Sequence, residues 1–252
     1  MNRFFLMYLL ILLVSSAIQA AEPADEFSKA NDLYKKGDYE NAILGFEKII
    51  KDGTVSSELY YNLGNSYFKS HKYPMALLYF EKAKKRNPGD EEILYNIEIT
   101  KLHTGDKIEA IEVFFLKRWV TIFIDFFSIE KWSYLSMSSF IIFLLFAGLF
   151  LFARNLFIKK LSFWMGLIIL CCSVGSFVIG GIQKKAILNS NEAIIITPTI
   201  TIKSSPAETG TDLFVLHEGT MVQITDKVGD WAEIRINDGN KGWVKNSDFS
   251  VI

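Results

Sequence analysis

Hydrophobic residues follow three different patterns along the chain. Residues 23–103 mix apolar and charged positions as a soluble helical domain does, residues 133–153 and 161–182 are almost continuously apolar, and short β-branched runs begin at Ala193. An apolar run of about 20 residues predicts a helix that crosses a membrane, and short alternating runs predict strands. We therefore expect a multi-domain membrane protein with an all-α domain, two transmembrane helices and a small all-β barrel.

The helical region repeats itself at a spacing of 34 residues, since Ala42 and Phe46 recur as Ala76 and Phe80. Together with Gly64, these positions resemble the signature of the tetratricopeptide repeat, in which small and large residues alternate where two antiparallel helices meet. We expect repeats at 23–56 and 57–90. A third helix at 91–103 would cap them, because repeat units do not bury their own apolar faces alone. The predicted domain spans 23–106.

Tetratricopeptide arrays bind peptides in a groove lined by the first helix of each pair. Four asparagines fall on that helix, and their amides suit an extended peptide backbone: Asn31, Asn62, Asn65 and Asn96. The alternative is that asparagine is simply common in the repeat. Arrays that clamp a C-terminal carboxylate need basic groove residues, whereas the matching positions here are Phe27, Glu92 and Asn96, so this ligand class is not expected.

The two apolar runs predict a hairpin of transmembrane helices, because the connection between them is short and carries Arg154, Lys159 and Lys160. Short basic loops stay in the cytoplasm. Residues 1–20 have the layout of a signal peptide cleaved after Ala20, with an uncleaved anchor as the alternative. Both large segments are then expected outside the cytoplasm.

Two further features belong to the membrane region. Cys172, Ser176 and Gly180 recur every fourth residue, and small residues at this spacing allow close helix packing, either within the hairpin or with another subunit. Residues 113–131 combine charges on a narrow arc with aromatic residues elsewhere. This pattern predicts an amphipathic helix in the membrane interface, with a third span as the alternative.

The last segment, 190–252, contains five or six short strand patterns separated by turns. Its run GDWAEIRI followed by GNKGWV resembles bacterial SH3 domains, which implies an SH3-like barrel and a cell-wall or protein ligand. Trp231 and Trp243, with Phe214, are the aromatic residues expected at its binding surface. The alternative is that the tryptophans belong to the core.

The sequence contains no motif that indicates catalysis or a cofactor, such as a glycine-rich phosphate loop, a G-x-S-x-G elbow or a C-x-x-C pair. Its two cysteines, Cys171 and Cys172, are adjacent and lie in an apolar run, so no metal site is expected. The net charge of −1 does not favour nucleic acid as a partner. A hydrolase would need a catalytic pair, and none is found.

The order of segments resembles BatE-type proteins of the bacterial aerotolerance operon. The resemblance implies a non-catalytic envelope component that works with von Willebrand-type membrane proteins. We therefore expect a membrane-anchored adaptor with two protein-binding modules in the periplasm. The rival hypothesis is a sensor or anchor whose barrel binds peptidoglycan.

Overall fold

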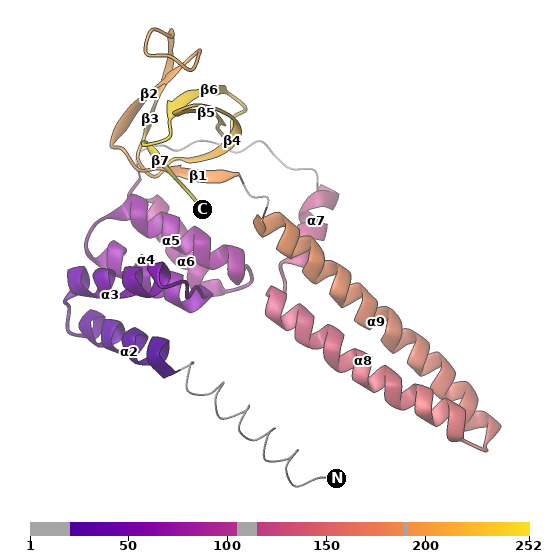
Figure 1. The fold of residues 1–252 in the computed structure, drawn as a ribbon. Helices are drawn as coiled ribbons and strands as arrows, with labels where there is room; N and C mark the ends of the chain where they lie inside the picture. Colours follow the sequence, from indigo (N-terminus) through magenta and orange to yellow (C-terminus); the bar gives the residue numbers. More distant parts are fainter. Residues whose placement is uncertain (1–20, 105–114, 189–190) are drawn as a thin grey trace.

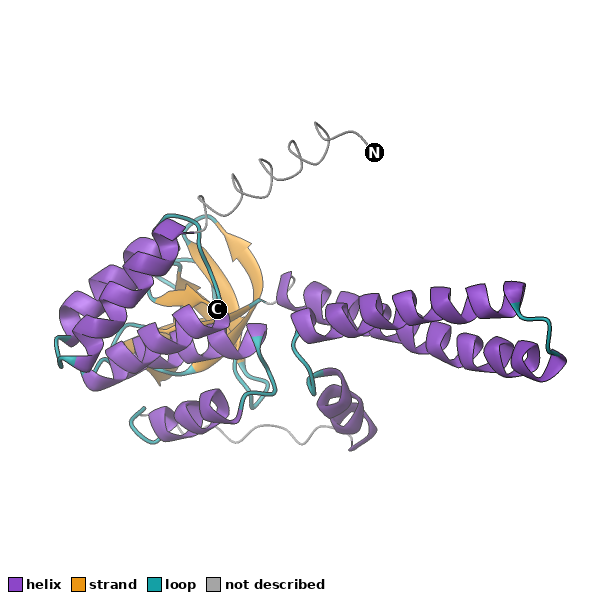
Figure 2. Cartoon of the chain, turned by 90° about the horizontal axis from the view of Figure 1, so that it is seen from below, coloured by secondary structure: helices purple, strands orange, loops and turns teal. Residues whose placement is uncertain are grey.

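The computed structural model describes residues 21–104, 115–188 and 191–252 (Figure 1). A helical domain and a β-sheet lie together, and a long helical hairpin projects away from them (Figures 1 and 2). The predicted signal peptide, residues 1–20, lies outside the described residues.

The N-terminal domain is a stack of antiparallel helices. The helices are α2 (Ala21–Lys35), α3 (Tyr39–Lys51), α4 (Ser57–Lys69), α5 (Tyr73–Arg86) and α6 (Glu91–Lys101). Side-chain caps fix where several of them begin. The Ser56 hydroxyl accepts a hydrogen bond from the Leu59 amide at 3.0 Å, and the Asp90 carboxylate accepts one from the Ile93 amide at 3.3 Å. Such caps satisfy amides that the first helical turn leaves unpaired.

The turns inside the two helix pairs have the same backbone shape. Gly37 and His71 stand at equivalent repeat positions and have φ of 81° and 61°. Glycine adopts this left-handed region readily, whereas a side chain at His71 is held there at a cost. The second turn is therefore more strained than the first.

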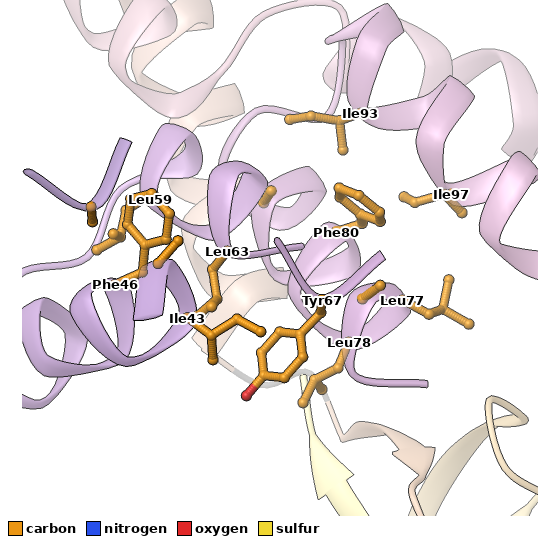
Figure 3. Packing of buried hydrophobic residues seen from close by; sticks show 14 of the residues in the cluster. Ile43, Phe46, Leu59, Leu63, Tyr67, Leu77, Leu78, Phe80, Ile93 and Ile97 are labelled. Atoms are coloured by element: carbon orange, nitrogen blue, oxygen red, sulfur yellow. The ribbon is translucent and has the colours of Figure 1, made fainter. Parts of the chain in front are cut away.

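The core of this domain lies between the paired helices (Figure 3). Phe46 and Phe80 are completely buried, together with Leu63 and Ala76. A β-carbon added at Gly64 would lie 2.7 Å from two ring atoms of Phe80, so this contact requires glycine. The first repeat has Ala30 at the position equivalent to Gly64, and its own glycine, Gly45, faces Ala30 from the other helix.

Three helices follow: α7 (Phe115–Ile124), α8 (Ile129–Phe152) and α9 (Leu156–Leu188). The predicted interfacial helix over 113–131 is not continuous. Helix α7 ends at Ile124, and Ser128 caps the start of α8 by accepting a hydrogen bond from the Lys131 amide at 3.4 Å. The end of α7 is closed by the Ile124 carbonyl, which accepts hydrogen bonds from the Trp132 indole at 3.0 Å and the Gln183 amide at 2.7 Å.

Helices α8 and α9 pack side by side and are long and apolar enough to cross a membrane, as judged by length and composition. Helix α8 begins at Ile129, before the predicted span 133–153, and ends at Phe152, whereas α9 extends beyond both ends of the predicted span 161–182. Large apolar side chains are exposed along them, and Phe152 and Phe177 are 86% and 74% exposed. Ser136 and Ser173 join the helices, because each hydroxyl donates to the other residue's carbonyl, at 3.0 and 2.9 Å.

The C-terminal domain is an antiparallel sheet of seven strands, where the sequence predicted five or six. They are β1 (Glu192–Ile195), β2 (Thr199–Lys203), β3 (Asp212–His217), β4 (Met221–Val228), β5 (Trp231–Arg235), β6 (Lys241–Lys245) and β7 (Phe249–Val251), in the spatial order β3-β2-β6-β5-β4-β1-β7. The short β7 pairs with β1 and completes the sheet. Alternation of buried and exposed residues gives the sheet its own apolar core, which includes Ile202, Ile234 and Val244.

Strand β1 also joins the sheet to the helical domain. Ile194 is fully buried and belongs to the hydrophobic cluster of the helices, with Ile252 packed against the same cluster. The Lys85 ammonium of α5 donates to the Ile252 carbonyl at 2.8 Å and lies 4.0 Å from the Glu192 carboxylate. The sheet therefore covers part of α5, the second helix of its pair.

Candidate functional site

The predicted groove residues lie on α2, α4 and α6, the first helices of successive pairs, and they form side-chain contacts with their neighbours. The Asn62 side-chain amide donates to the side-chain oxygen (Oδ1) of Asn31 at 3.0 Å, and the Asn96 side-chain amide donates to the Tyr61 hydroxyl at 3.0 Å. All four predicted asparagines, including Asn65, are half-buried. Each donated hydrogen bond leaves the oxygen of Asn62 or Asn96 able to accept a further one.

Between α4 and α6 the groove contains a cavity of about 370 Å³. Its lining includes Asn62, Tyr61 and three carboxylates, Glu58, Asp90 and Glu92, and none of its described lining residues is Lys or Arg. The Tyr61 hydroxyl also donates to Glu92 at 3.2 Å. A cavity with this charge suits a basic segment and disfavours a C-terminal carboxylate.

Tyr61, Glu58 and Asp90 were not among the predicted groove residues. A signal was present, because Glu58 and Glu92 are separated by the repeat spacing and both stand in the first turn of a groove helix. Equivalent positions on neighbouring first helices face the same side of a repeat array. Burial raises the pKa of Tyr61, opposed by hydrogen bonds from Asn65 and Asn96, so its hydroxyl stays protonated at neutral pH.

The tryptophans of the sheet share one face. Trp231 of β5 and Trp243 of β6 are half-exposed, whereas Ala232 and Val244 beside them are buried. Trp231 pairs with Lys245 and Trp243 with Glu233, so the two indoles are diagonal neighbours. The Lys245 ammonium lies 5.8 Å from the centre of the Trp231 ring. We call Trp231 and Trp243 the tryptophan face.

Phe214 does not lie with the tryptophans. It is opposite Ile202 in the β2–β3 ladder and packs against the buried core of the sheet. Directly opposed residues in an antiparallel ladder point to the same side, and Ile202 is fully buried. The structure therefore places Phe214 toward the core, while Trp231 and Trp243 lie outside that cluster.

The predicted packing stripe of α9 is only partly at the α8 contact. Ser176 and Gly180 are buried, and a β-carbon added at Gly180 would lie 3.6 Å from that of Trp132. Cys172 is exposed, and its neighbour Ser173 makes the interhelical contact instead. Within the described segments, no group of three or more His, Cys, Asp or Glu residues is arranged to hold a metal ion.

Comparison with family models finds two matches. Residues 57–90, which are the second predicted repeat, match the tetratricopeptide repeat, and residues 198–250 match the bacterial SH3 domain. No curated protein matches the chain. The helical pair α4–α5 and the antiparallel sheet are the folds that these two models describe. The chain thus contains a tetratricopeptide repeat and a bacterial SH3 domain, both of which are typically non-catalytic binding modules.

Proposed function

We propose that this protein is a non-catalytic adaptor, anchored by α8 and α9 in a bacterial inner membrane, that presents its two binding modules in the periplasm. The observation that supports this most is the arrangement of the modules. The sheet covers α5, while the carboxylate-lined groove lies on the first helices of the pairs and the tryptophan face lies on β5 and β6. Both candidate surfaces are therefore accessible to partners.

Exposed apolar residues support the membrane anchor. A water-soluble hairpin rarely displays continuous apolar surface of the kind seen on α8 and α9, whereas lipid tails solvate it. The basic residues Arg154, Lys159 and Lys160 lie at the hairpin connection and favour a cytoplasmic location for it. Helix α7 carries exposed aromatic side chains, including Trp119 and Phe123, and we place it in the outer interface.

The chemistry of the groove favours a partner segment with Lys or Arg side chains. Its backbone would donate to the free oxygens of Asn62 and Asn96, and its cations would face Glu58, Asp90 and Glu92. Such a segment would belong to another envelope protein. The resemblance to BatE-type proteins suggests von Willebrand-type membrane proteins of an aerotolerance-type complex.

Co-purification from membranes tests this proposal. Replacing Asn62 and Asn96 by Ala removes two hydrogen bonds to the partner, each worth about 0.5–1.5 kcal/mol. Partner binding should therefore weaken about 5- to 150-fold. Asn41→Ala is the matched control, because Asn41 is an exposed asparagine on α3, outside the groove. Capture that is unchanged by the double substitution would refute the groove as the binding site.

The tryptophan face favours a second candidate function, which is binding of peptidoglycan by the SH3 domain. Two diagonally placed, half-exposed indoles suit stacking on a sugar or peptide surface. Purified sacculi should then retain the full-length protein in detergent, and Trp231→Ala with Trp243→Ala should abolish retention. If sacculi do not retain the wild-type protein, this function is excluded, and the adaptor proposal is unaffected.

A further inference from the structure

A groove of about 720 Å³ runs along one side of the α8–α9 pair, and we call it the hairpin groove. Small residues of both helices line much of it: Ser133, Ser136, Ser173, Ser176, Gly180 and Gly181. Met137, Phe140 and Phe177 also line it, and these large side chains are 67%, 47% and 74% exposed. Small residues on a membrane helix allow a further helix to approach closely, and exposed apolar side chains beside them offer it contact area.

The Ser176 hydroxyl has no hydrogen-bond partner in the hairpin groove. The three other serines of the lining donate to carbonyls of α8 or α9 at 2.8 to 3.0 Å. Ser176 is 4% exposed and makes no hydrogen bond with any residue that the structure describes. Its hydroxyl is still reachable, because among the described side chains the unpaired polar atoms that are fully enclosed belong to Glu81 and Gln183. The bilayer core supplies no water to this hydroxyl and an acyl chain offers no acceptor, so its partner would come from another protein helix.

One end of the hairpin groove carries two unpaired charges. Lys184 lines the groove near the end of α9, and Glu130 lies in the first turn of α8, about two helical turns before Met137 on the same face. Both residues belong to the same end of the hairpin, because a β-carbon added at Gly180 would lie 3.6 Å from that of Trp132. Both are exposed, and neither forms an ion pair within residues 21–104, 115–188 and 191–252. An occupant with opposite charges at this level would pair with both.

A second copy of this chain has that charge pattern. Copies with the same orientation in a membrane, related by a twofold axis along the membrane normal, present the same end of the hairpin at the same depth. A twofold interface is self-complementary, so Glu130 of each copy lies opposite Lys184 of the other and the pair forms twice. The same symmetry brings two hairpin grooves together, each with its unpaired serine hydroxyl.

We propose that the hairpin groove is the interface of a homodimer, in which α8 and α9 of one copy pack against those of a second copy. The Ser176 hydroxyl donates to a carbonyl across the interface, and Glu130 and Lys184 pair between the copies. Each assembly then presents two carboxylate-lined grooves and two tryptophan faces. This inference rests on the membrane anchoring in the proposed function.

The first test measures association of the full-length chain in lipid vesicles, by Förster transfer between copies that carry a donor or an acceptor dye. The wild-type chain should form dimers, and Gly181→Leu should weaken them about fivefold or more, because the new side chain fills the groove. A β-carbon at Gly181 meets no atom of its own chain within 4 Å, so the hairpin itself tolerates the change. Gly175→Leu is the matched control, since Gly175 is equally open on α9 but does not line the groove. It should leave dimerisation unchanged.

The second test reverses the charges. Glu130→Lys or Lys184→Glu alone should weaken the dimer about 2- to 30-fold, because two exposed ion pairs are lost. The two reversals together should restore it, since each copy then carries the inverted pattern. Lys185→Glu changes a neighbouring exposed lysine outside the lining and should have no effect. If Gly181→Leu reduces the yield of folded chain, the charge reversals decide.

A monomeric wild-type chain in vesicles would overturn the proposal. It would also be overturned by equal effects of Gly181→Leu and Gly175→Leu, or by a doubly reversed chain that does not recover. A different membrane protein that is lost on Gly181→Leu, while the wild-type chain stays monomeric, would identify another occupant. Extraction of cell membranes with alkaline carbonate tests the anchoring separately. A chain that resists extraction but is monomeric refutes the dimer alone, whereas a chain that is extracted refutes the anchoring.

Discussion

The contact between Gly64 and Phe80 predicts whether Gly64→Ala stabilises or destabilises the helical domain, and the sign of that change tests the contact. In an ordinary helix interior, glycine-to-alanine substitution stabilises by about 1 kcal/mol, because alanine has the higher helix propensity. Here the new methyl group would lie 2.7 Å from Cδ1 and Cε1 of Phe80 and 3.2 Å from Cγ. The ring is fully buried beside α6, so it has little room to move (Figure 3).

Overpacking of this kind costs about 1–3 kcal/mol. Set against the gain in propensity, Gly64→Ala is expected to lower the free energy of unfolding of the helical domain by about 0–2 kcal/mol. Gly45→Ala is a graded control, because its new methyl group would meet Ala30 alone, with the Ala30 Cβ at 3.0 Å and its Cα at 3.6 Å. Gly45→Ala should lower the free energy of unfolding by less than Gly64→Ala does.

Native-state hydrogen exchange of α4 and α5 amides in the full chain measures the relevant opening free energy. A double-mutant cycle with Phe80→Leu then isolates the contact. In that background the methyl group has more room, so the two substitutions should be coupled by about 1–3 kcal/mol. The assigned packing would be refuted if Gly64→Ala stabilised the domain by about 1 kcal/mol in both backgrounds.

Three further predictions concern Asp125, the contact between β1 and α5, and the membrane topology. Burial raises the pKa of Asp125 above its ordinary value of 3.8, so the folded state favours the protonated acid. The protonated acid therefore contributes to the free energy of unfolding in full below pH 3.8, and this contribution is lost as the pH rises through the raised pKa. Asp125→Asn should therefore raise the melting temperature at neutral pH and not below pH 3.8; an equal rise at both would contradict this. Ile194→Ala should destabilise by about 2–5 kcal/mol and increase amide exchange in both β1 and α5, and an increase confined to the sheet would count against the junction. Reporter fusions at Gly89 and Asn240 should both report the periplasm, whereas opposite compartments would mean that 113–131 crosses the bilayer.

Much of the architecture was predictable, because the physical signals are local and repeated. The repeat signature predicted that Gly64 lies where two paired helices approach closely, and the apolar runs predicted the helices α8 and α9. The break after Ile124 was not predicted. It depends on hydrogen bonds from Trp132 and Gln183, and Gln183 is distant in sequence.

The candidate sites were predictable only in part. Asn62 and Asn96 lie on the groove helices, but the contacts of Asn62 with Asn31 and of Asn96 with Tyr61 depend on how neighbouring pairs stack. The sequence around Phe214 did not show which of its residues face the core. One bulge in the β2–β3 ladder shifts the register there, so alternation along the strand does not identify the buried face. The cavity of about 490 Å³ between the helical domain, α7, α9 and the sheet is lined by residues of α5, α7, α9, β1 and β4, and no local pattern encodes that assembly.

The burial of Ile194 against the helical domain bears on how a divalent partner would be selected. Two binding modules joined by a flexible linker accept ligands of many lengths, and the effective concentration of the second site falls slowly with linker length. Here the SH3 sheet is held directly on α5 by Ile194 and by Lys85. The separation of groove and tryptophan face is thus fixed, so under the proposed function only a partner whose two motifs match that separation would gain avidity. The pair of modules would then select partners by the distance between their two motifs, and a partner that carries both motifs at the wrong distance would bind through one module only.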